Sequence, residues 1–146
     1  MTLSPFTTLA ASQEGLEFTE VILKNGITLK YKILKDEPLV SMYTVFPIGM
    51  NQEKIKGIAH LMEHLVFRGG AGNDFQDIAA ITTRKGGYFN GFTSFNATAY
   101  NYVVPKENFT TAFKVFNGSI WETNLSENMV ELERKIVVHE LDMDYS

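Results

Sequence analysis

Apolar and polar residues alternate along the first part of the chain. Residues 18–24 (FTEVILK) and 27–34 (ITLKYKIL) follow the two-residue period of a half-buried strand, and Asn25-Gly26 between them favours a tight hairpin turn. Residues 39–49 (LVSMYTVFPIG) are almost continuously apolar, which predicts a third strand that is buried on both of its faces. We therefore expect the helices that follow to cover this strand.

Helical patterns come next along the chain. Residues 57–67 (GIAHLMEHLVF) form an amphipathic stretch that is followed closely by two glycines, which is a common way for a helix to end. Asn73-Asp74 can cap a second helix over residues 75–85.

The second half of the chain predicts one hairpin and two further helices. Residues 88–104 are rich in aromatic and β-branched side chains, which favours a hairpin that turns near Phe95-Asn96. Helix signals return over residues 105–120 and again from residue 126 onwards. The complete order β-β-β-α-α-β-β-α-α is typical of an α+β domain, in which a mostly antiparallel sheet packs against helices.

Composition and charge exclude several functions. Of the 146 residues, 45% are hydrophobic, which is enough for a folded core. The formal net charge is −4 and the sequence has no Lys/Arg-rich stripe, so we expect neither a nucleic-acid partner nor a membrane partner. Cysteine is absent, which excludes disulfides, thiolate catalysis and metal sites built on cysteine.

The first residues lack the features of a signal peptide. Residues 1–17 contain neither a basic region nor an unbroken apolar region. We expect them to form a flexible lead-in to one domain over residues 18–146, and the missing signal favours a cytoplasmic location. The apolar stretches are too short to span a bilayer.

His60, Glu63 and His64 form the pattern H-x-x-E-H within the first predicted helix. Residues four apart lie on one face of a helix, so both imidazoles can bind one metal ion while Glu63 projects beside it. This is the inverzincin order of a zinc-peptidase motif. Zinc with three protein ligands lowers the pKa of a bound water to about 7, and the Glu63 carboxylate would take that water's proton. The alternative is a pair of histidines that face solvent or a packed neighbour.

A third ligand must come from another part of the chain. Glu133 and Glu140 are seven residues apart in the last predicted helix, so they share one helical face. Glu140 as the ligand, with Glu133 behind it to orient a histidine through a hydrogen bond, is a chemically sensible pair. His139 is an alternative ligand, although it cannot share the face of Glu133. A solvated acidic face is the other alternative.

Several motifs in this order resemble the pitrilysin/insulinase family of zinc peptidases. The resemblance runs from Gly49 to Glu140, and it begins with G-x-x-x-E at Gly49 to Glu53. GIAHLMEHLVFRGG resembles the family's motif helix, and KGGYFNGFTSFNATAY resembles its hairpin, with Gly91 where alanine is usual. ELERKIVVHELDM resembles the segment whose final glutamate is the third zinc ligand.

The resemblance implies roles for individual residues. His60, His64 and Glu140 would bind zinc. Glu63 would be the catalytic base, with Glu133 as the nearby acidic residue that supports the catalytic centre. A strand would hold an extended peptide substrate as an added strand, because main-chain pairing at a sheet edge accepts many sequences. The residues of that strand are Asn90, Gly91, Phe92 and Thr93. The alternative is a core hairpin whose aromatic side chains only pack.

The family's catalytic half continues beyond the third ligand, and a second half or a partner subunit closes over the substrate. The resemblance therefore implies a truncated half-domain. It would act as a zinc-dependent endopeptidase on extended oligopeptides, assembled as a homo-oligomer or together with a complementary second-half subunit. The alternative is a truncated, non-catalytic module that binds zinc and peptide. A purely structural zinc site is less compatible with three protein ligands.

Overall fold

The computed structural model describes residues 8–11, 17–70, 73–74, 80, 83–84 and 86–144. The chain divides into two compact units, Met1–Glu37 and Pro38–Ser146. The second predicted helix, over residues 75–85, lies largely outside the described residues, and so does most of the predicted lead-in.

The first unit is an antiparallel sheet with the order β1-β2-β3. Its strands are β1 (Thr8–Ala11), β2 (Phe18–Ile22) and β3 (Thr28–Tyr31). The predicted turn joins β2 to β3: the backbone N–H of Ile27 donates to Asn25 Oδ1 at 3.2 Å, and Gly26 has a φ of +86°. A positive φ is readily adopted by glycine, which explains the Asn-Gly pair. Strand β1 lies inside the segment that the sequence suggested was a lead-in.

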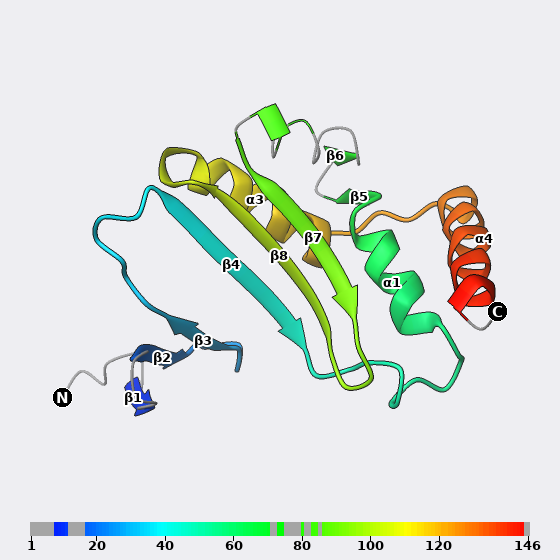
Figure 1. Ribbon diagram of the computed structural model, residues 1–146, viewed down its shortest axis with the longest axis horizontal. Helices are drawn as coiled ribbons and strands as arrows, with labels where there is room; N and C mark the ends of the chain where they lie inside the picture. Colours follow the sequence, from blue (N-terminus) through cyan, green and yellow to red (C-terminus); the bar gives the residue numbers. More distant parts are fainter. Residues whose placement is uncertain are drawn as a thin grey trace. The chain divides into compact units, whose positions relative to one another are not determined.

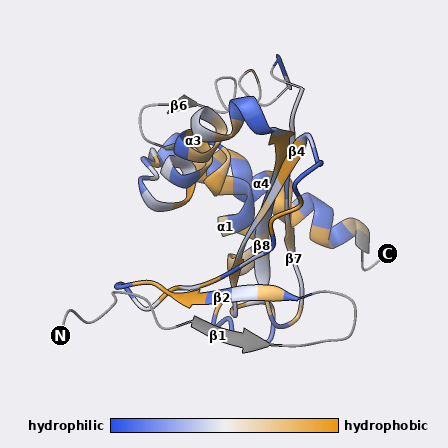
Figure 2. Ribbon diagram, turned by 90° about the vertical axis from the view of Figure 1, so that its left-hand side faces the viewer, coloured by the Kyte–Doolittle hydropathy of each residue, from blue (hydrophilic) through white to orange (hydrophobic). Residues whose placement is uncertain are grey.

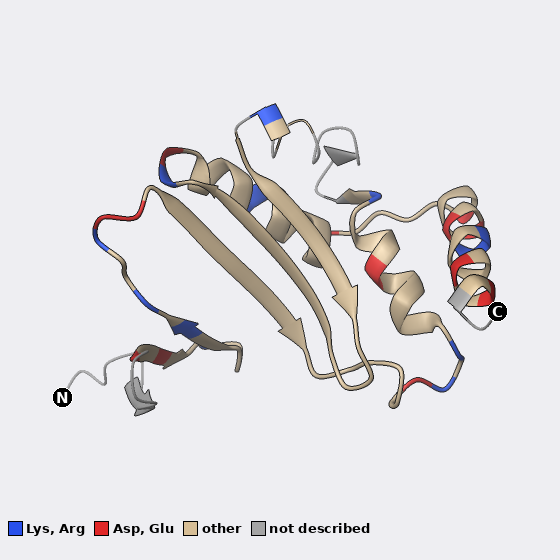
Figure 3. Ribbon diagram, viewed as in Figure 1, with Lys and Arg blue, Asp and Glu red and all other residues tan. Residues whose placement is uncertain are grey.

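The second unit is built on an antiparallel sheet with the order β4-β8-β7 (Figure 1). Its strands are β4 (Leu39–Phe46), β7 (Tyr88–Thr93) and β8 (Thr98–Pro105). The backbone N–H of Ser94 donates to the carbonyl of Ala97 at 2.8 Å and closes the β7–β8 hairpin where the sequence predicts a turn. These strands carry no charged side chain (Figure 3).

Helices complete the second unit. They are α1 (Ile58–Val66), the short 3-10 helix η1 (Lys106–Asn108), α3 (Phe109–Trp121) and α4 (Glu127–Asp144), and a small ribbon of β5 (Gly69–Gly70) and β6 (Asn73–Asp74) follows α1. Ser126 begins α4 as expected, because its hydroxyl accepts a hydrogen bond from the N–H of Met129 at 3.3 Å. None of the helices in the described part of the chain has the length and apolarity needed to cross a membrane.

The core of the second unit lies between one face of the sheet and the helices α1 and α3 (Figure 2). Tyr102 and Val104 of the central strand β8 are fully buried. The ring of Tyr102 packs on the ring of Phe116 from α3, with 4.6 Å between the centroids. Val66 of α1 belongs to the same core cluster. The helix that bears H-x-x-E-H is therefore anchored to the sheet through its apolar face.

The prediction that residues 39–49 are buried on both faces is wrong. Alternate residues of β4 are exposed, and the side chains of Tyr43 and Val45 are 58% and 59% exposed. The physical reason is that α1 and α3 pack against one face of this sheet. Within the described residues β4 is also an edge strand, bonded to β8 alone. An apolar run on such a strand does not require a second covering layer.

Candidate metal centre

Glu53 fixes the start of α1, the helix that carries both candidate histidine ligands. Its Oε1 accepts a hydrogen bond from the N–H of Gly57 at 2.6 Å, and its Oε2 accepts one from the N–H of Ala59 at 3.0 Å. These donors have no partner inside the helix, and a carboxylate is favoured near the positive end of the helix dipole. Gly57 itself has a φ of +85°, a backbone conformation that is costly for residues with a side chain. The glutamate of G-x-x-x-E therefore caps the helix.

The glycine of the same motif fixes the loop that leads to α1. The N–H of Met50 donates to the carbonyl of Ser94 at 3.0 Å, and the N–H of Asn51 donates to that of Phe95 at 2.8 Å. A Cβ added at Gly49 would lie 2.3 Å from Ser94 O and 2.6 Å from Ala97 N. The loop can approach the β7–β8 turn this closely because residue 49 has no side chain.

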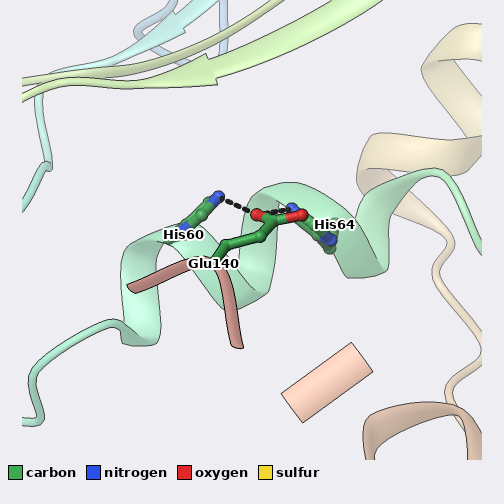
Figure 4. A group of neighbouring side chains, drawn as sticks. All are labelled: His60, His64 and Glu140. Atoms are coloured by element: carbon green, nitrogen blue, oxygen red, sulfur yellow. Dashed lines mark ion pairs between the residues drawn. The ribbon is translucent and has the colours of Figure 1, made fainter. Parts of the chain in front are cut away.

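His60, His64 and Glu140 converge on one point, as the sequence predicts (Figure 4). Glu140 Oε2 lies 3.4 Å from His60 Nε2 and 3.5 Å from His64 Nε2. Each residue offers one ligand atom, and these atoms all lie within 4.8 Å of one another. The two imidazoles come from successive turns of α1, and the carboxylate comes from α4.

This donor set fits a zinc ion. Ligand atoms about 2.0–2.1 Å from a tetrahedral zinc ion lie about 3.4 Å apart, which matches the two contacts of Glu140. Two imidazole nitrogens and one carboxylate oxygen are typical ligands of catalytic zinc, where the fourth position is left to water. His139, the alternative ligand, is exposed and does not belong to this group among the described residues.

Glu133 lies behind the metal-binding edge of His64, also as predicted. Its side chain is only 1% exposed, and its Oε2 lies 3.0 Å from His64 Nδ1. A carboxylate can only accept here, so Nδ1 of His64 carries a proton and Nε2 is left free to bind metal. Arg68 Nη2 lies 2.5 Å from Glu133 Oε1, and this ion pair compensates the buried negative charge. The ion pair of Arg68 with Glu133 was not predicted from the sequence.

The predicted base, Glu63, lies against strand β7. Thr93 Oγ1 donates to Glu63 Oε2 at 2.6 Å. A Cβ on Gly91 would lie 2.9 Å from Glu63 Cγ, so the glutamate packs directly on the glycine backbone. Thr93 was predicted to bind substrate, and its contact with Glu63 was not predicted from the sequence. The two-residue period of a strand, which places residues 91 and 93 on one face, was the available signal.

The other residues of the predicted peptide-binding strand lie on the opposite face of the sheet. Asn90 is exposed there, and Phe92 is 48% exposed. Phe92 and Tyr88 are therefore not core residues of the described structure, whereas Tyr100 on β8 is buried. Burial and, to a smaller extent, the negative charge of Glu63 raise the pKa of Tyr100 above its usual value. The Tyr100 hydroxyl, which donates to the carbonyl of Met62 at 3.4 Å, thus stays protonated at neutral pH.

A pocket of about 370 Å³ opens beside the metal-binding group. His60, Phe95 and Leu141 line it together with residues of the loop before α1. The pocket is therefore bounded by the loop before α1, the β7–β8 turn and α4, and it lies next to His60, a candidate metal ligand.

Comparison with known proteins gives a consistent picture. The family model described as "Insulinase (Peptidase family M16)" matches residues 44–144. The uncharacterized zinc protease YmxG of Bacillus subtilis (strain 168) is 29% identical over 125 residues, which cover 82% of this chain and 30% of that protein. The mitochondrial-processing peptidase subunit beta of Neurospora crassa is 24% identical over 131 residues, which cover 88% of this chain and 28% of that protein.

A solved structure shares the fold. The crystal structure of pitrilysin superposes with a TM-score of 0.80 at 21% sequence identity, covering 97% of this chain and 16% of that chain. The α+β fold class expected from the sequence is thereby confirmed. The chain spans about 30% of the length of the two relatives described above.

Proposed function

The chain belongs to the insulinase family, peptidase family M16, and we propose that it is the zinc-binding part of an endopeptidase that hydrolyses extended oligopeptides. One observation carries this proposal. His60, His64 and Glu140 converge within 4.8 Å, and Glu63 projects from the same helix as the two histidines. A metal-binding group next to a carboxylate provides the two parts that metal-assisted hydrolysis requires.

The metal ligands, Glu63 and Glu133 would each have a separate role in hydrolysis. A zinc ion bound by His60, His64 and Glu140 would supply a Lewis acid and lower the pKa of a water molecule in its open position to about 7. Glu63 would take a proton from this water while the water oxygen forms a bond to the peptide carbonyl carbon. The same carboxyl group would then deliver the proton to the amide nitrogen as the C–N bond breaks. Glu133 would hold His64 in the tautomer that leaves Nε2 unprotonated.

Strand β7 supports the proposal that the substrate is an extended peptide. Within the described residues β7 pairs with β8 on one side, and no strand pairs with its other side. That free edge runs past α1, whose Glu63 lies against Gly91. Main-chain groups along Asn90, Gly91, Phe92 and Thr93 would bind a peptide backbone whatever its sequence. The strand is uncharged, so it would not select strongly for charged substrates.

We propose that turnover requires assembly. Loss of a single oxyanion donor costs about 10²–10³ in rate, and none of the residues assigned above to metal binding or proton transfer is an oxyanion donor. One relative, the mitochondrial-processing peptidase subunit beta, is by its name a subunit. A second copy of this chain would supply oxyanion donors and exclude water from the site.

Cleavage of a library of internally quenched peptides by the zinc-loaded chain tests this proposal. We expect cleavage that depends on zinc and that rises more than linearly with protein concentration, since assembly would complete the site. Glu63→Gln should lower kcat by about 10²–10⁴ because it removes the base and keeps the shape of the side chain. Full zinc occupancy without cleavage at any concentration would contradict the proposal.

Glu131→Gln is the matched control for this experiment. Glu131 is exposed on α4 and pairs with Arg134 on the same helix, away from the metal ligands. The same chemical change at this position should leave the cleavage rate unchanged. Equal rates for wild type and Glu63→Gln would remove Glu63 from the mechanism, even if zinc is bound.

A further inference from the structure

The Thr93 hydroxyl makes a short hydrogen bond to the carboxylate of Glu63. The distance from Oγ1 to Oε2 is 2.6 Å, and the bond is partly buried. This is the range of charge-assisted O–H···O⁻ bonds, which are stronger than bonds between neutral groups. The bond joins β7 to α1, two elements that the chain brings together from 30 residues apart. A rigid strand therefore holds one oxygen of a helical side chain.

The backbone of Gly91 is the second part of β7 that packs against the Glu63 side chain. An added Cβ would lie 2.9 Å from Glu63 Cγ, 3.2 Å from Glu63 Oε1 and 3.0 Å from Phe67 Cε2. The Cγ of Glu63 thus lies where it would clash with the Cβ of an alanine at residue 91. With Thr93 on Oε2 and Gly91 beneath the stem, two contacts from one face of β7 restrain the carboxylate.

We propose that Thr93 is a positioning residue for the catalytic base, and that it acts by restraining the Glu63 carboxylate in one orientation. This inference rests on the proposed function. A carboxylate oxygen that accepts from Thr93 is occupied, so Oε1 is left to take the proton of the water. Free rotation of the Glu63 carboxyl group would otherwise spread it over several orientations, and proton transfer requires hydrogen-bond distance in a defined geometry.

The proposal assigns the side chain of Thr93 a role different from the substrate binding proposed for its main chain. Its hydroxyl faces α1 and is engaged by Glu63, whereas Asn90 and Phe92 are exposed on the other face of the sheet. A residue that binds peptide would change KM when it is altered. A residue that orients the base would change kcat and leave KM and zinc affinity in place.

Thr93→Val and Thr93→Ser separate these roles in the peptide-cleavage assay. Valine keeps the shape and removes the hydroxyl, so we expect kcat to fall about 10-fold or more with KM and zinc affinity within about twofold of wild type. Serine keeps the hydroxyl and should retain kcat within about threefold. Thr111→Val, an exposed position on α3, is the control and should match wild type.

Two results would overturn the proposal in an active enzyme. One is a normal kcat for Thr93→Val. The other is an equal loss in Thr93→Ser and Thr93→Val, since that would make the side chain a structural element only. A rise in KM alone would return Thr93 to substrate binding and would also contradict the positioning role.

A second measurement keeps the test independent of activity. Unfolding equilibria of wild type, Thr93→Val, Glu63→Met and the double variant form a double-mutant cycle, because methionine has about the same length and lacks the carboxylate acceptor. We expect the two changes to be coupled by at least about threefold in the unfolding equilibrium constant. Each single change already breaks the hydrogen bond between the hydroxyl and the carboxylate, so the second change cannot break it again. If the wild-type chain shows no turnover, the proposed function fails, and this coupling alone decides whether Thr93 holds Glu63. Additive effects would show that it does not.

Discussion

His64 of α1 and Glu133 of α4 are joined by a hydrogen bond of 3.0 Å between Nδ1 and Oε2, and the carboxylate is almost completely buried. This bond selects the tautomer of the histidine and links the two helices that share the metal-binding group. Arg68 pairs with the other oxygen of Glu133, so the buried charge is balanced. Glu133 and Arg68 thus restrain the orientation of His64, one of the three candidate metal ligands.

Glu133→Gln should weaken zinc binding about 10–100-fold, since partners of this kind orient a ligand and raise its basicity. Competition with a chromophoric chelator measures the affinity. Glu131→Gln is the control, because Glu131 is exposed on the same helix and pairs with Arg134. Equal zinc affinities for wild type and Glu133→Gln would show that the bond to His64 does not orient the ligand.

Gly49→Ala should lower both stability and zinc affinity. The new Cβ would lie 2.3 Å from the Ser94 carbonyl oxygen, and backbone atoms must move to accept it. We expect a loss of about 1–3 kcal/mol in the free energy of unfolding. Zinc affinity should fall as well, because the loop that leads to α1 is displaced.

Gly26→Ala provides the comparison for this change. Gly26 has a φ of +86° but open space around it, so alanine there meets backbone strain without a clash. The cost should be about 1–2 kcal/mol, with zinc affinity unchanged. If the Gly49→Ala and Gly26→Ala chains bind zinc equally tightly, the close approach of residue 49 to the β7–β8 turn does not position α1.

Phe116→Ala should reduce the free energy of unfolding by about 3–5 kcal/mol, because it opens a cavity next to Tyr102 in the core. Phe113→Ala on the same helix is the control. Phe113 is 37% exposed and Phe116 is 4% exposed, so the control should lose less than half as much. Chemical denaturation measures both values. Similar losses at the two positions would contradict the placement of α3.

Stability should fall as the pH rises above about 10. Burial raises the pKa of Tyr102 in the folded chain, whereas the unfolded chain has the ordinary value of about 10. Below that value both states bind the proton, and the stability is fully present. Above it the unfolded state releases the proton and the folded state retains it, so unfolding is favoured until the pH passes the raised value.

Tyr102→Phe should therefore reduce the dependence of the unfolding midpoint on pH between about 9 and 11, and the buried Tyr100 should account for part of what remains. Its hydroxyl donates to Met42 Sδ at 3.3 Å, a weak bond whose loss costs little at neutral pH. Tyr43→Phe, at an exposed position, is the control and should keep the wild-type dependence. Parallel curves for Tyr102→Phe and wild type would contradict the account.

Local signals in the sequence predicted much of the fold. Asn25-Gly26 sets a turn through the backbone freedom of glycine, and Ser126 begins a helix through its own hydroxyl. Such features depend on neighbours in the chain, so they can be recognised without knowledge of the fold. The spacing of Glu133 and Glu140 on one helical face likewise placed both residues at the metal centre.

Contacts between distant segments were harder to predict. The apolar run in β4 suggested two covered faces, but whether a face is covered depends on where the helices pack. The partners Thr93 and Arg68 were missed because nothing near them in the sequence specifies which side chain of α1 or α4 they meet. The fragment Gly49–Glu53 gave a recognisable motif, yet its capping and close-approach roles became visible only in three dimensions.

X-ray absorption spectroscopy of the chain loaded with one equivalent of Zn²⁺ tests the central claim most directly. The account predicts one tightly bound zinc ion with two imidazole nitrogens at about 2.0–2.1 Å and oxygen donors at about 2.0–2.2 Å. His60→Ala should remove one imidazole from the spectrum, and Glu140→Ala should lower the affinity strongly. A zinc ion that stays bound with the wild-type spectrum and affinity in both variants would contradict the shared site of His60, His64 and Glu140.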